Sequence, residues 1–370
     1  MDNKNHLPWV EKYRPENLTD IISHKEIINT LGNLISNNKI PHMIFYGPPG
    51  TGKTTTILAC AKQIYGPNYR SMVLELNGSD ERGINVVREQ IKNFSATNSK
   101  IHTMFNSNIN NNITNIKLVI LDEADAMTYD AQFALRRVVE SYTDSTRFCL
   151  ICNYLTKIIP ALHSRCQMFR FVPINTIEHI KKIDMVISTE NIEIEQLAKE
   201  KIVELSEGDM RKSLNLLQSL HMINNQNEFK LITLNSVYKT IGYPTDEEKK
   251  IIINSLQNKS LLTSYQILNN LQSEKSLSNQ DIIREISSYY SKTYIQSYKK
   301  NNKIKTKTKV NFSPPLARTP PTWEKMDLKE QNKLIDLFDG LAKIEINLLT
   351  NTNLNIHLLA ISSVINNYNR

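Results

Sequence analysis

The sequence is poor in the residues that stabilise small secreted proteins and in the long apolar runs that cross membranes. Its 370 residues contain four cysteines, too few for a disulfide framework, which indicates a reducing compartment. The longest apolar runs, such as LVIL at 118–121, are far too short to span a bilayer. The first fifteen residues contain no apolar segment of the kind that secretory signals carry. We therefore expect no membrane partner.

A zinc site is also poorly supported, although Cys149 and Cys152 form a CxxC pair. No second pair of cysteines or histidines accompanies them at the spacing of zinc ligands. The two residues lie three apart on an expected strand, so their side chains should point to opposite faces of a sheet. We interpret both as ordinary core cysteines.

Acidic residues are fewer than basic ones, with 37 Asp and Glu against 45 Lys and Arg, and the net charge is +8. This balance is compatible with a polyanionic partner but identifies none, because many basic proteins bind no nucleic acid. A hydrophobic fraction of 40% with 22% charged residues is typical of a globular chain with two or three domains.

Short apolar strands alternate with helical stretches from about residue 40 to 172. The expected strands lie at 43–46, 72–76, 117–121, 147–152 and 167–171, and the expected helices at 53–65, 84–94 and 130–142. Near-continuous apolar strands that alternate with helices indicate a parallel sheet covered on both faces. Residues 1–173 are therefore predicted to form an α/β domain.

No strand pattern follows Pro173. A small helical domain is expected at 174–240, with helices near 178–188, 195–206 and 209–223. A second all-helical domain is expected at 241–370, with its last helices at 330–349 and 356–368. The sequence thus predicts an α/β domain followed by two all-α domains.

Two segments interrupt this plan. Residues 98–115 are rich in asparagine and lack periodicity, which is typical of a mobile loop. Residues 299–321 begin with six lysines in eleven residues and continue into SPPLARTPP, which is typical of a flexible basic insertion. Both compositions are also those of ordinary surface loops, so they assign no role to either segment.

Glycine is scarce, with 10 in the chain, yet three lie within residues 47–52. Residues 47–54 read GPPGTGKT, which fits GxxxxGK[ST] with a strand before the loop and a helix after it. Glycines permit a tight turn whose N–H groups face phosphate oxygens, and the helix N-terminus adds positive potential. The nucleotide-binding residues predicted from this loop are Gly47, Pro48, Pro49, Gly50, Thr51, Gly52, Lys53, Thr54 and Thr55. Lys53 should contact the β- and γ-phosphates of ATP, and the Thr54 hydroxyl should bind Mg²⁺.

A second motif, LVILDEAD at 118–125, is an apolar strand that ends in acids. A buried strand that delivers Asp122 to its carboxyl end would place this carboxylate near the Mg²⁺. Glu123 is then placed to orient and deprotonate the attacking water. Alone, such a strand is equally an ordinary sheet edge; together with the P-loop it predicts a site that hydrolyses ATP.

Seven runs, in the same order along the chain, resemble the small subunits of replication factor C, the clamp-loader branch of the AAA+ ATPases. They are PWVEKYRP at 8–15, FYGPPGTGKTT at 45–55, LELNGSDERGINVVR at 74–88, LVILDEADAM at 118–127, QFALRRVVE at 132–140, CNYLTKIIPALHSRC at 152–166 and GDMRKSLNLLQ at 208–218. The runs cover nearly all of residues 8–220, and the chain after 240 matches by helical pattern only. The resemblance implies an AAA+ P-loop domain, a helical lid and a helical collar that builds a pentameric ring.

The resemblance also implies residues that contact the nucleotide outside the P-loop. Val10, Tyr13, Arg14 and Pro15 match the N-terminal segment that closes over adenine in this family. An arm that simply packs on the domain, with Trp9 and Tyr13 as anchors, is also compatible with these residues, and both roles could hold.

Two further polar residues match the sensors of the family. Asn153, at the end of the fourth expected strand, matches sensor 1, where an amide can bond the attacking water or the γ-phosphate. Arg211 matches sensor 2. Its spacing against Met210, Leu214 and Leu217 places it off the apolar stripe of its helix, so it is free to reach a ligand.

Arg165 lies in the SRC run that carries the arginine finger of this family. The resemblance implies that it projects into the ATP site of a neighbouring subunit and stabilises charge on the transferred phosphoryl group. Without the resemblance it is an ordinary loop arginine. Arg136 and Arg137 lie on a helix that either faces a neighbour or is solvated.

DNA contacts are expected from Arg82, Arg88 and Lys92. Arg88 and Lys92 share one helix face, whereas Glu81 and Glu89 dilute the positive charge. By themselves these residues are a solvated face. The resemblance implies instead that they follow the phosphate backbone without reading sequence.

Two positions depart from the family pattern: Gly78 replaces the usual alanine, and His163 replaces the common glutamine. Neither is expected to touch the proposed chemistry.

We therefore expect an ATPase subunit of the sliding-clamp loader, with ATP and Mg²⁺ as cofactors. Its expected partners are the other replication factor C subunits, the sliding clamp and primer–template DNA, and its expected location is the nucleus. One alternative is another AAA+ DNA-remodelling ATPase, although the sequence has no aromatic-glycine pore motif. The other is a nucleotide-binding scaffold subunit of the same kind of complex, which would have no chemical need of Lys53, Asp122, Glu123 and Asn153 together.

Overall fold

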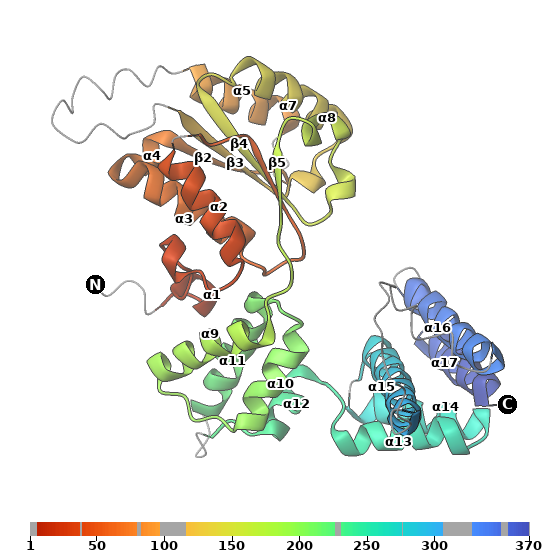
Figure 1. The fold of residues 1–370 in the computed structure, drawn as a ribbon. Helices are drawn as coiled ribbons and strands as arrows, with labels where there is room; N and C mark the ends of the chain where they lie inside the picture. The colour runs from red at the N-terminus through yellow and green to blue at the C-terminus, as the bar shows by residue number, and fades with distance from the viewer. Residues whose placement is uncertain are drawn as a thin grey trace, which may run out of the picture. The chain divides into compact units, whose positions relative to one another are not determined.

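The computed structural model describes residues 6–37, 39–79, 83–96, 116–225, 231–275, 277–305, 328–348 and 354–369. Contacts between Cα atoms divide the chain into two compact units, Met1–Val237 and Tyr238–Arg370. The first unit contains a sheet flanked by helices and then a helical bundle, and the second unit is helical in the part of the chain that is described (Figure 1).

A parallel sheet forms the centre of the first unit. Its strands are β1 (Met43–Tyr46), β2 (Val73–Asn77), β3 (Lys117–Asp122), β4 (Thr146–Cys152) and β5 (Gln167–Arg170). They lie in the order β2-β3-β4-β1-β5, and each neighbouring pair is parallel. The three inner strands are almost completely buried, as expected for parallel strands with helices on both faces. The carboxyl ends of all the strands therefore lie at one edge.

Helices cover the two faces of this sheet (Figure 1). One face carries α2 (Lys25–Ser36), α3 (Lys53–Tyr65) and α4 (Tyr69–Met72), and the other carries α5 (Gly83–Ala96), α7 (Tyr129–Ser141) and α8 (Pro160–His163). Side chains alternate along each strand, so Phe45 and Ile120 enter the first core while Ile44 and Leu121 enter the second. The two cores hold the strands rigidly, and with them the residues at the strand ends.

The CxxC pair has the predicted arrangement. Cys149 belongs to the core on one face of the sheet and Cys152 to the core on the other. Both are buried free thiols, and burial raises the pKa of each. Within the described residues, no group of three or more His, Cys, Asp and Glu side chains could hold a metal ion. The interpretation as core cysteines is confirmed.

The helical bundle of the first unit consists of α9 (Thr176–Glu190), α10 (Gln196–Ser206) and α11 (Met210–Asn225), followed by α12 (Leu234–Ile241). Its core contains four fully buried residues, Ile183, Val186, Ile202 and Leu217. The short α1 (Trp9–Lys12) packs against this bundle, and Trp9 is part of its core. The N-terminal arm is thus fastened to helices that lie about 200 residues later in the chain.

The second unit contains α13 (Asp246–Asn258), α14 (Leu261–Lys275), α15 (Asn279–Lys305), α16 (Leu328–Leu348) and α17 (Leu354–Asn369). A capping box starts α13: Glu248 N–H donates to the Thr245 hydroxyl, and Thr245 N–H donates to the Glu248 carboxylate. The apolar stripes of the helices form one core, which includes Ile252, Leu268 and Ile361. No helix among the described residues is both long enough and apolar enough to cross a membrane.

The predicted elements agree closely with these bounds. The strand at 43–46 and the helix at 53–65 coincide with β1 and α3, and the other predicted elements end within two residues of the observed ones. One expectation was wrong: α15 continues to Lys305, so the start of the expected insertion at 299–321 is helical. The rest of that segment, and the loop at 98–115, lie outside the described residues. The division into three domains remains a prediction.

Candidate nucleotide-binding site

The loop between β1 and α3 requires glycine at two positions. Gly47 has φ 144° and Gly50 has φ 67°, backbone conformations that other residues rarely adopt. A Cβ atom on Gly47 would lie 2.0 Å from the Phe171 carbonyl oxygen, and one on Gly50 would lie 1.7 Å from Asp209 Oδ1. The loop therefore packs closely on both sides. Because α3 begins at Lys53, its N-terminus points toward the loop, which favours an anion there.

Lys53 is held at this loop by three acceptors. Its Nζ atom donates to the carbonyl oxygens of Gly47 at 2.7 Å and Pro48 at 2.8 Å, and to Asn153 Oδ1 at 2.9 Å. The residue is only 7% exposed, and this burial lowers the pKa of its ammonium group, while the Asp122 carboxylate opposes the shift. A buried cation next to a phosphate-binding loop is suited to a polyphosphate ligand.

The acids at the end of β3 lie beside the P-loop. Thr54 Oγ1 donates to Asp122 Oδ2 at 2.7 Å, and the other Asp122 oxygen accepts from the Glu123 N–H at 2.8 Å. Glu123 has φ 52°, a left-handed conformation that is uncommon for residues other than glycine, and it is exposed. A hydroxyl and a carboxylate in contact are oxygen ligands of the kind that Mg²⁺ prefers, so Thr54 and Asp122 could hold this ion.

Asn153 lies at the end of β4, next to the end of β3 in the sheet. Asp125 joins these two strand ends, because its Oδ2 atom accepts from the N–H groups of Asn153 and Tyr154, both at 3.2 Å. This role of Asp125 was not predicted, although the residue closes the same LVILDEAD run. It keeps Asn153 beside Lys53.

The first residues of α11 close over the P-loop. Met210 N–H donates to the Gly50 carbonyl at 3.2 Å, and the Asp209 carboxylate caps the helix by accepting from the Arg211 N–H at 2.8 Å. The Arg211 side chain is exposed while the apolar stripe of α11 is buried, so it lies off this stripe as predicted, and its contact with a ligand stays a prediction. The bundle and the α/β part thus enclose a common cleft.

This cleft is open to solvent, and the space within it, the open mouth included, is about 1180 Å³. The predicted residues that line it are Val10, Tyr13, Arg14, Pro15, Pro49, Gly50, Thr51, Gly52, Lys53, Thr54, Thr55, Asp122, Glu123, Asn153 and Arg211. Gly47 and Pro48 were predicted with them but do not line the cleft. Their carbonyl oxygens accept hydrogen bonds from Lys53. The structure therefore gathers the arm, the P-loop, two strand ends and the bundle around one space.

Four polar residues that the sequence analysis did not single out also line this cleft: Asp20, Ser23, Glu178 and Lys182. Lys182, on α9, is only 9% exposed; burial lowers the pKa of its ammonium group, and Asp20 opposes the shift. No local motif marks these residues, because they come from separate segments that meet only in the folded chain.

Gly78 was not expected to touch the proposed chemistry, yet it contacts the backbone of the acidic turn. Its N–H donates to the Asp122 carbonyl at 2.7 Å, and a Cβ atom at this position would lie 2.6 Å from the Glu123 carbonyl oxygen. Glycine therefore lets the end of β2 approach the acidic turn after β3. The backbone of Glu123 is in direct contact with this departure from the family pattern.

Comparisons with known proteins assign the family. Residues 43–174 match the model described as ATPase family associated with various cellular activities (AAA), and residues 181–222 match the RCF1/5-like, AAA+ ATPase lid domain. The chain is 49% identical over 277 residues to replication factor C subunit 3 of Schizosaccharomyces pombe, covering 75% of this chain and 76% of the relative. The chain belongs to the replication factor C family.

Further relatives define the subgroup within replication factor C. Subunit 5 of Homo sapiens is 47% identical over 281 residues, covering 76% of this chain and 78% of the relative. Subunit 3 of Saccharomyces cerevisiae is 44% identical over 284 residues, covering 77% and 80%. The LPWVEKYRP and CNYLTKIIPALHSRC runs predict this same subgroup, the third small subunit in budding yeast and the fifth in humans, and the prediction is confirmed. The expected AAA+ ATPase subunit of the clamp loader is confirmed with it.

A solved structure of the Thermotoga maritima RuvB Holliday junction branch migration motor also matches, with a TM-score of 0.48 and 16% identity. The match covers 72% of this chain and 86% of that chain. The assignment to the replication factor C family does not rest on this match.

The expected arginine finger of this replication factor C subunit lies outside its own cleft. Arg165 follows α8, and its Nη2 atom lies 2.6 Å from Glu140 Oε1 on α7. Its Nη1 atom donates to the Ala161 carbonyl at 2.8 Å. Arg136 shares the same carboxylate oxygen at 3.0 Å, so it is paired and not simply solvated. Arg165 is exposed, which leaves it accessible to a neighbouring molecule.

The expected DNA contacts of this replication factor C subunit are described only in part. Arg82 lies outside the described residues, and Arg88 lies on α5. Lys92, on the same helix, is exposed. The helix therefore presents at least one of the three predicted cations to solvent.

Proposed function

We propose that this replication factor C subunit binds ATP with Mg²⁺ in its cleft and hydrolyses the ATP as part of a clamp-loader ring. The observation that carries this proposal is the cluster at the carboxyl end of the sheet. There Lys53 lies 2.9 Å from Asn153, and Thr54 lies 2.7 Å from Asp122. A P-loop cation, a metal-binding pair and a polar sensor in one cleft are the parts that phosphoryl transfer requires.

The chain's own residues then divide the work. Lys53 binds the β- and γ-phosphates as a compact charge, and Thr54 and Asp122 hold Mg²⁺, which neutralises phosphate charge when bound. Asn153 orients the attacking water through its amide, and Glu123 accepts a proton from it.

The opposite end of the cleft receives the base. Val10, Tyr13, Arg14 and Pro15 enclose adenine, and Arg211 extends from α11 toward the phosphates. Their place among the residues that line the same cleft as the P-loop supports this assignment. One cleft thus contacts both ends of the nucleotide.

Arg165 acts in a different site, that of the neighbouring subunit. It is exposed and absent from the wall of its own cleft, which supports a role in trans. In this position its guanidinium would stabilise negative charge on the transferred phosphoryl group. The pairing with Glu140 must then be exchanged for the phosphate when two subunits assemble.

The assembled ring opens the sliding clamp and places it on primer–template DNA, in the nucleus. ATP binds the clamp-competent assembly more tightly than other arrangements and so shifts the population toward it. Hydrolysis then releases the closed clamp on DNA. Arg82, Arg88 and Lys92 follow the DNA backbone through phosphate contacts.

The test of this function replaces Arg165 by Ala in a ring with wild-type partner subunits. ATP occupancy of this chain's own cleft should remain nearly unchanged. Hydrolysis at the adjacent site should fall, because arginine fingers contribute about 10³- to 10⁵-fold elsewhere, although sites that fire together can mask part of the loss. DNA-stimulated turnover and nucleotide occupancy are measured together. Unchanged turnover in the mixed ring would contradict the role in trans.

The DNA contacts have a separate test. Replacing Arg82, Arg88 and Lys92 by Ala should weaken DNA binding about equally for all sequences and flatten its salt dependence, because fewer counterions are released. DNA affinity is measured over a range of salt concentrations. An unchanged slope would show that these side chains are only solvated.

A further inference from the structure

The N-terminal arm lines the nucleotide cleft but is anchored on the lid bundle. Trp9 is only 6% exposed and packs in the core of the bundle. The backbone N–H of Trp9 donates to Gln218 Oε1 on α11 at 3.0 Å, and the centre of its ring lies 5.4 Å from the centre of the His221 ring. The start of the arm is therefore part of the bundle's packing.

Glu190, the last residue of α9, makes a second and more polar attachment. Lys12 Nζ lies 2.5 Å from Glu190 Oε1, and the Tyr13 hydroxyl donates to the same oxygen. The Lys12 and Glu190 side chains are 19% and 17% exposed, so both bonds are largely shielded from water. Charge-assisted bonds at such a position are stronger than those of exposed surface pairs.

The chain leaves the bundle just after this attachment. Tyr13, Arg14 and Pro15 line the cleft, and Leu18 is already buried in the core of the α/β part. The cleft wall formed by the arm thus lies directly next to the bonds at Glu190. Contacts that hold Tyr13 in place therefore also hold this part of the cleft wall in place.

We propose that Glu190 is a positioning residue for the base-binding end of the cleft. It does not line the cleft itself. It holds Tyr13 and Lys12, so that the arm and the lid present a single wall to the base. This inference rests on the proposed function only in that the cleft must bind ATP.

The experiment compares two ligands on the full-length isolated chain. ATP occupies both ends of the cleft, whereas inorganic tripolyphosphate reaches only the phosphate end. Glu190→Ala should weaken ATP binding roughly tenfold, as expected for loss of a coupled polar network. It should leave the affinity for tripolyphosphate within about twofold. Both affinities are measured by competition against a fluorescent ATP analogue.

Two variants test the connection through Tyr13. Tyr13→Phe removes only the hydroxyl, and the double variant with Glu190→Ala should bind ATP no more weakly than the weaker single variant, because both changes break the same bond. Glu190→Gln keeps an acceptor but loses the charge opposite Lys12, so its effect should be intermediate. These conservative changes also decide the proposal if Glu190→Ala does not fold.

The matched control lies on the same helix. Asp184→Asn breaks the 2.8 Å ion pair between Lys199 and Asp184, which does not involve the arm. This variant should bind ATP like the wild type. Arm docking is followed by Trp9 fluorescence in a Trp323→Phe background, since the chain has two tryptophans. Glu190→Ala should raise the mobility of Trp9, and Asp184→Asn should not.

Two results would overturn the proposal: an unchanged ATP affinity in Glu190→Ala, or an equal loss for ATP and tripolyphosphate. The second result would mean that the variant loosens the whole cleft. Failure of the wild-type chain to bind ATP at all would instead contradict the proposed function, so the two failures are distinguishable.

Discussion

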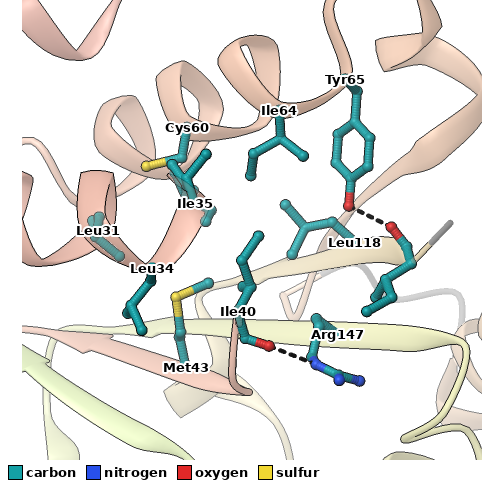
Figure 2. Close-up of a pocket in the computed structure, with 12 residues that line it drawn as sticks. Leu31, Leu34, Ile35, Ile40, Met43, Cys60, Ile64, Tyr65, Leu118 and Arg147 are labelled. Carbon is teal, nitrogen blue, oxygen red and sulfur yellow. Dashed lines mark hydrogen bonds between the residues drawn. The ribbon is translucent and has the colours of Figure 1, made fainter. Parts of the chain in front are cut away.

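The two ends of the parallel sheet have opposite chemistry, although the same strands build both. At the carboxyl ends, β3 and β4 lead to Asp122 and Asn153, which line the open cleft together with the P-loop. At the amino ends, Met43, Leu118 and Arg147 line a much smaller and largely apolar cavity (Figure 2). One strand, β3, contributes Leu118 to the cavity and Asp122 to the cleft.

Aliphatic side chains dominate the amino-end cavity. Figure 2 shows them pointing inward from α2, α3 and the strands; they include Leu31, Leu34, Ile35, Met43, Ile64 and Leu118. The polar groups there bond to backbone: the Tyr65 hydroxyl donates to the Ile116 carbonyl at 2.7 Å, and Arg147 Nε donates to the Ile40 carbonyl at 2.6 Å. Burial raises the pKa of the Cys60 thiol to about 12, so it is unreactive near neutral pH. Among the described residues, the tyrosine and the arginine of this wall are bonded to carbonyl oxygens and are not arranged to bind an anion.

The difference follows from the direction of the strands. In a parallel sheet each helix starts near the carboxyl end of the preceding strand, so free N–H groups and loop side chains gather at that edge. The other edge receives helix ends and strand starts, whose side chains mainly fill space. We therefore expect substitutions at the carboxyl end to change nucleotide chemistry, and those at the amino end to change stability.

The largest effect is expected for Lys53→Ala at the carboxyl end. It removes the only P-loop cation of the sequence, at a cost of about 3–5 kcal/mol, so ATP binding to the isolated chain should fall below detection. Binding of labelled ATP is the measurement. Lys62→Ala is the matched control, because Lys62 lies on the same helix but is exposed. Tight binding by Lys53→Ala would mean that the nucleotide site is elsewhere.

Glu123→Gln should abolish most turnover at this subunit while leaving ATP bound. The amide has the same shape but cannot accept the proton, and general bases contribute about 10²- to 10⁴-fold. ATP turnover and occupancy are measured in the assembled ring. If turnover of the ring is unchanged, this subunit is a nucleotide-binding scaffold without turnover of its own.

Leu118→Ala tests the amino end on the strand that also carries Asp122. The side chain is 2% exposed, so its truncation should destabilise the first unit by about 2–5 kcal/mol. Urea unfolding measures the loss, and ATP affinity of the folded variant should stay within about twofold of the wild type. Asp122→Asn is the reciprocal control, with the larger effect on Mg²⁺-dependent turnover. A large loss of ATP affinity in Leu118→Ala would show that the two ends are coupled.

The smallest effect is a pH dependence from His42, which precedes β1. Its Nδ1 atom accepts from the Phe148 N–H at 3.2 Å, and burial, with the charge of Arg147, lowers the pKa of the ring to about 4. An unfolded histidine has a pKa of about 6.5, so the unfolded chain takes up the proton first as the pH falls. The contribution of neutral His42 to the free energy of unfolding should be fully present above pH 6.5 and should be lost as the pH falls toward 4. The loss should be about 2 kcal/mol after allowance for solvent screening.

His42→Asn keeps an acceptor for Phe148 but cannot titrate, so it isolates this contribution. Urea unfolding of both chains at several pH values provides the comparison. The wild type should lose more stability than His42→Asn between pH 6.5 and pH 4. Parallel losses in the two chains would show that His42 does not carry the dependence.

The phosphate end of the cleft was predictable because its residues are adjacent in the chain. GPPGTGKT has the required strand before it and helix after it, and the bounds of β1 and α3 agree with prediction. Asp122 was singled out because it ends an apolar strand, whereas Asn153, which directly follows β4, was singled out through the resemblance to sensor 1. The helices whose bounds were predicted agree to within two residues for the same reason: their apolar spacing is local.

Contacts between distant segments were not predictable in this way. Asp209 packs against Gly50, Gly78 packs against the Glu123 carbonyl, and Lys182 lines the cleft, yet no spacing in the sequence joins these positions. The contact at Gly78 is the clearest case, because the residue was not expected to touch the proposed chemistry. The approach of two backbones is set by how the strand ends pack, which a single sequence does not reveal.

By itself the sequence determined the class of chemistry, the order of strands and helices along the chain, and the family. These depend on contiguous motifs and on the periodic spacing of apolar residues, and both can be read directly from the sequence. The tertiary structure alone decided which groups lie together: the arm with the lid through Glu190, Arg165 with Glu140, and the apolar cavity with the amino end of β3. These contacts join residues that are far apart in the sequence. They form only because the helices and strands pack in a particular orientation, which depends on the whole fold.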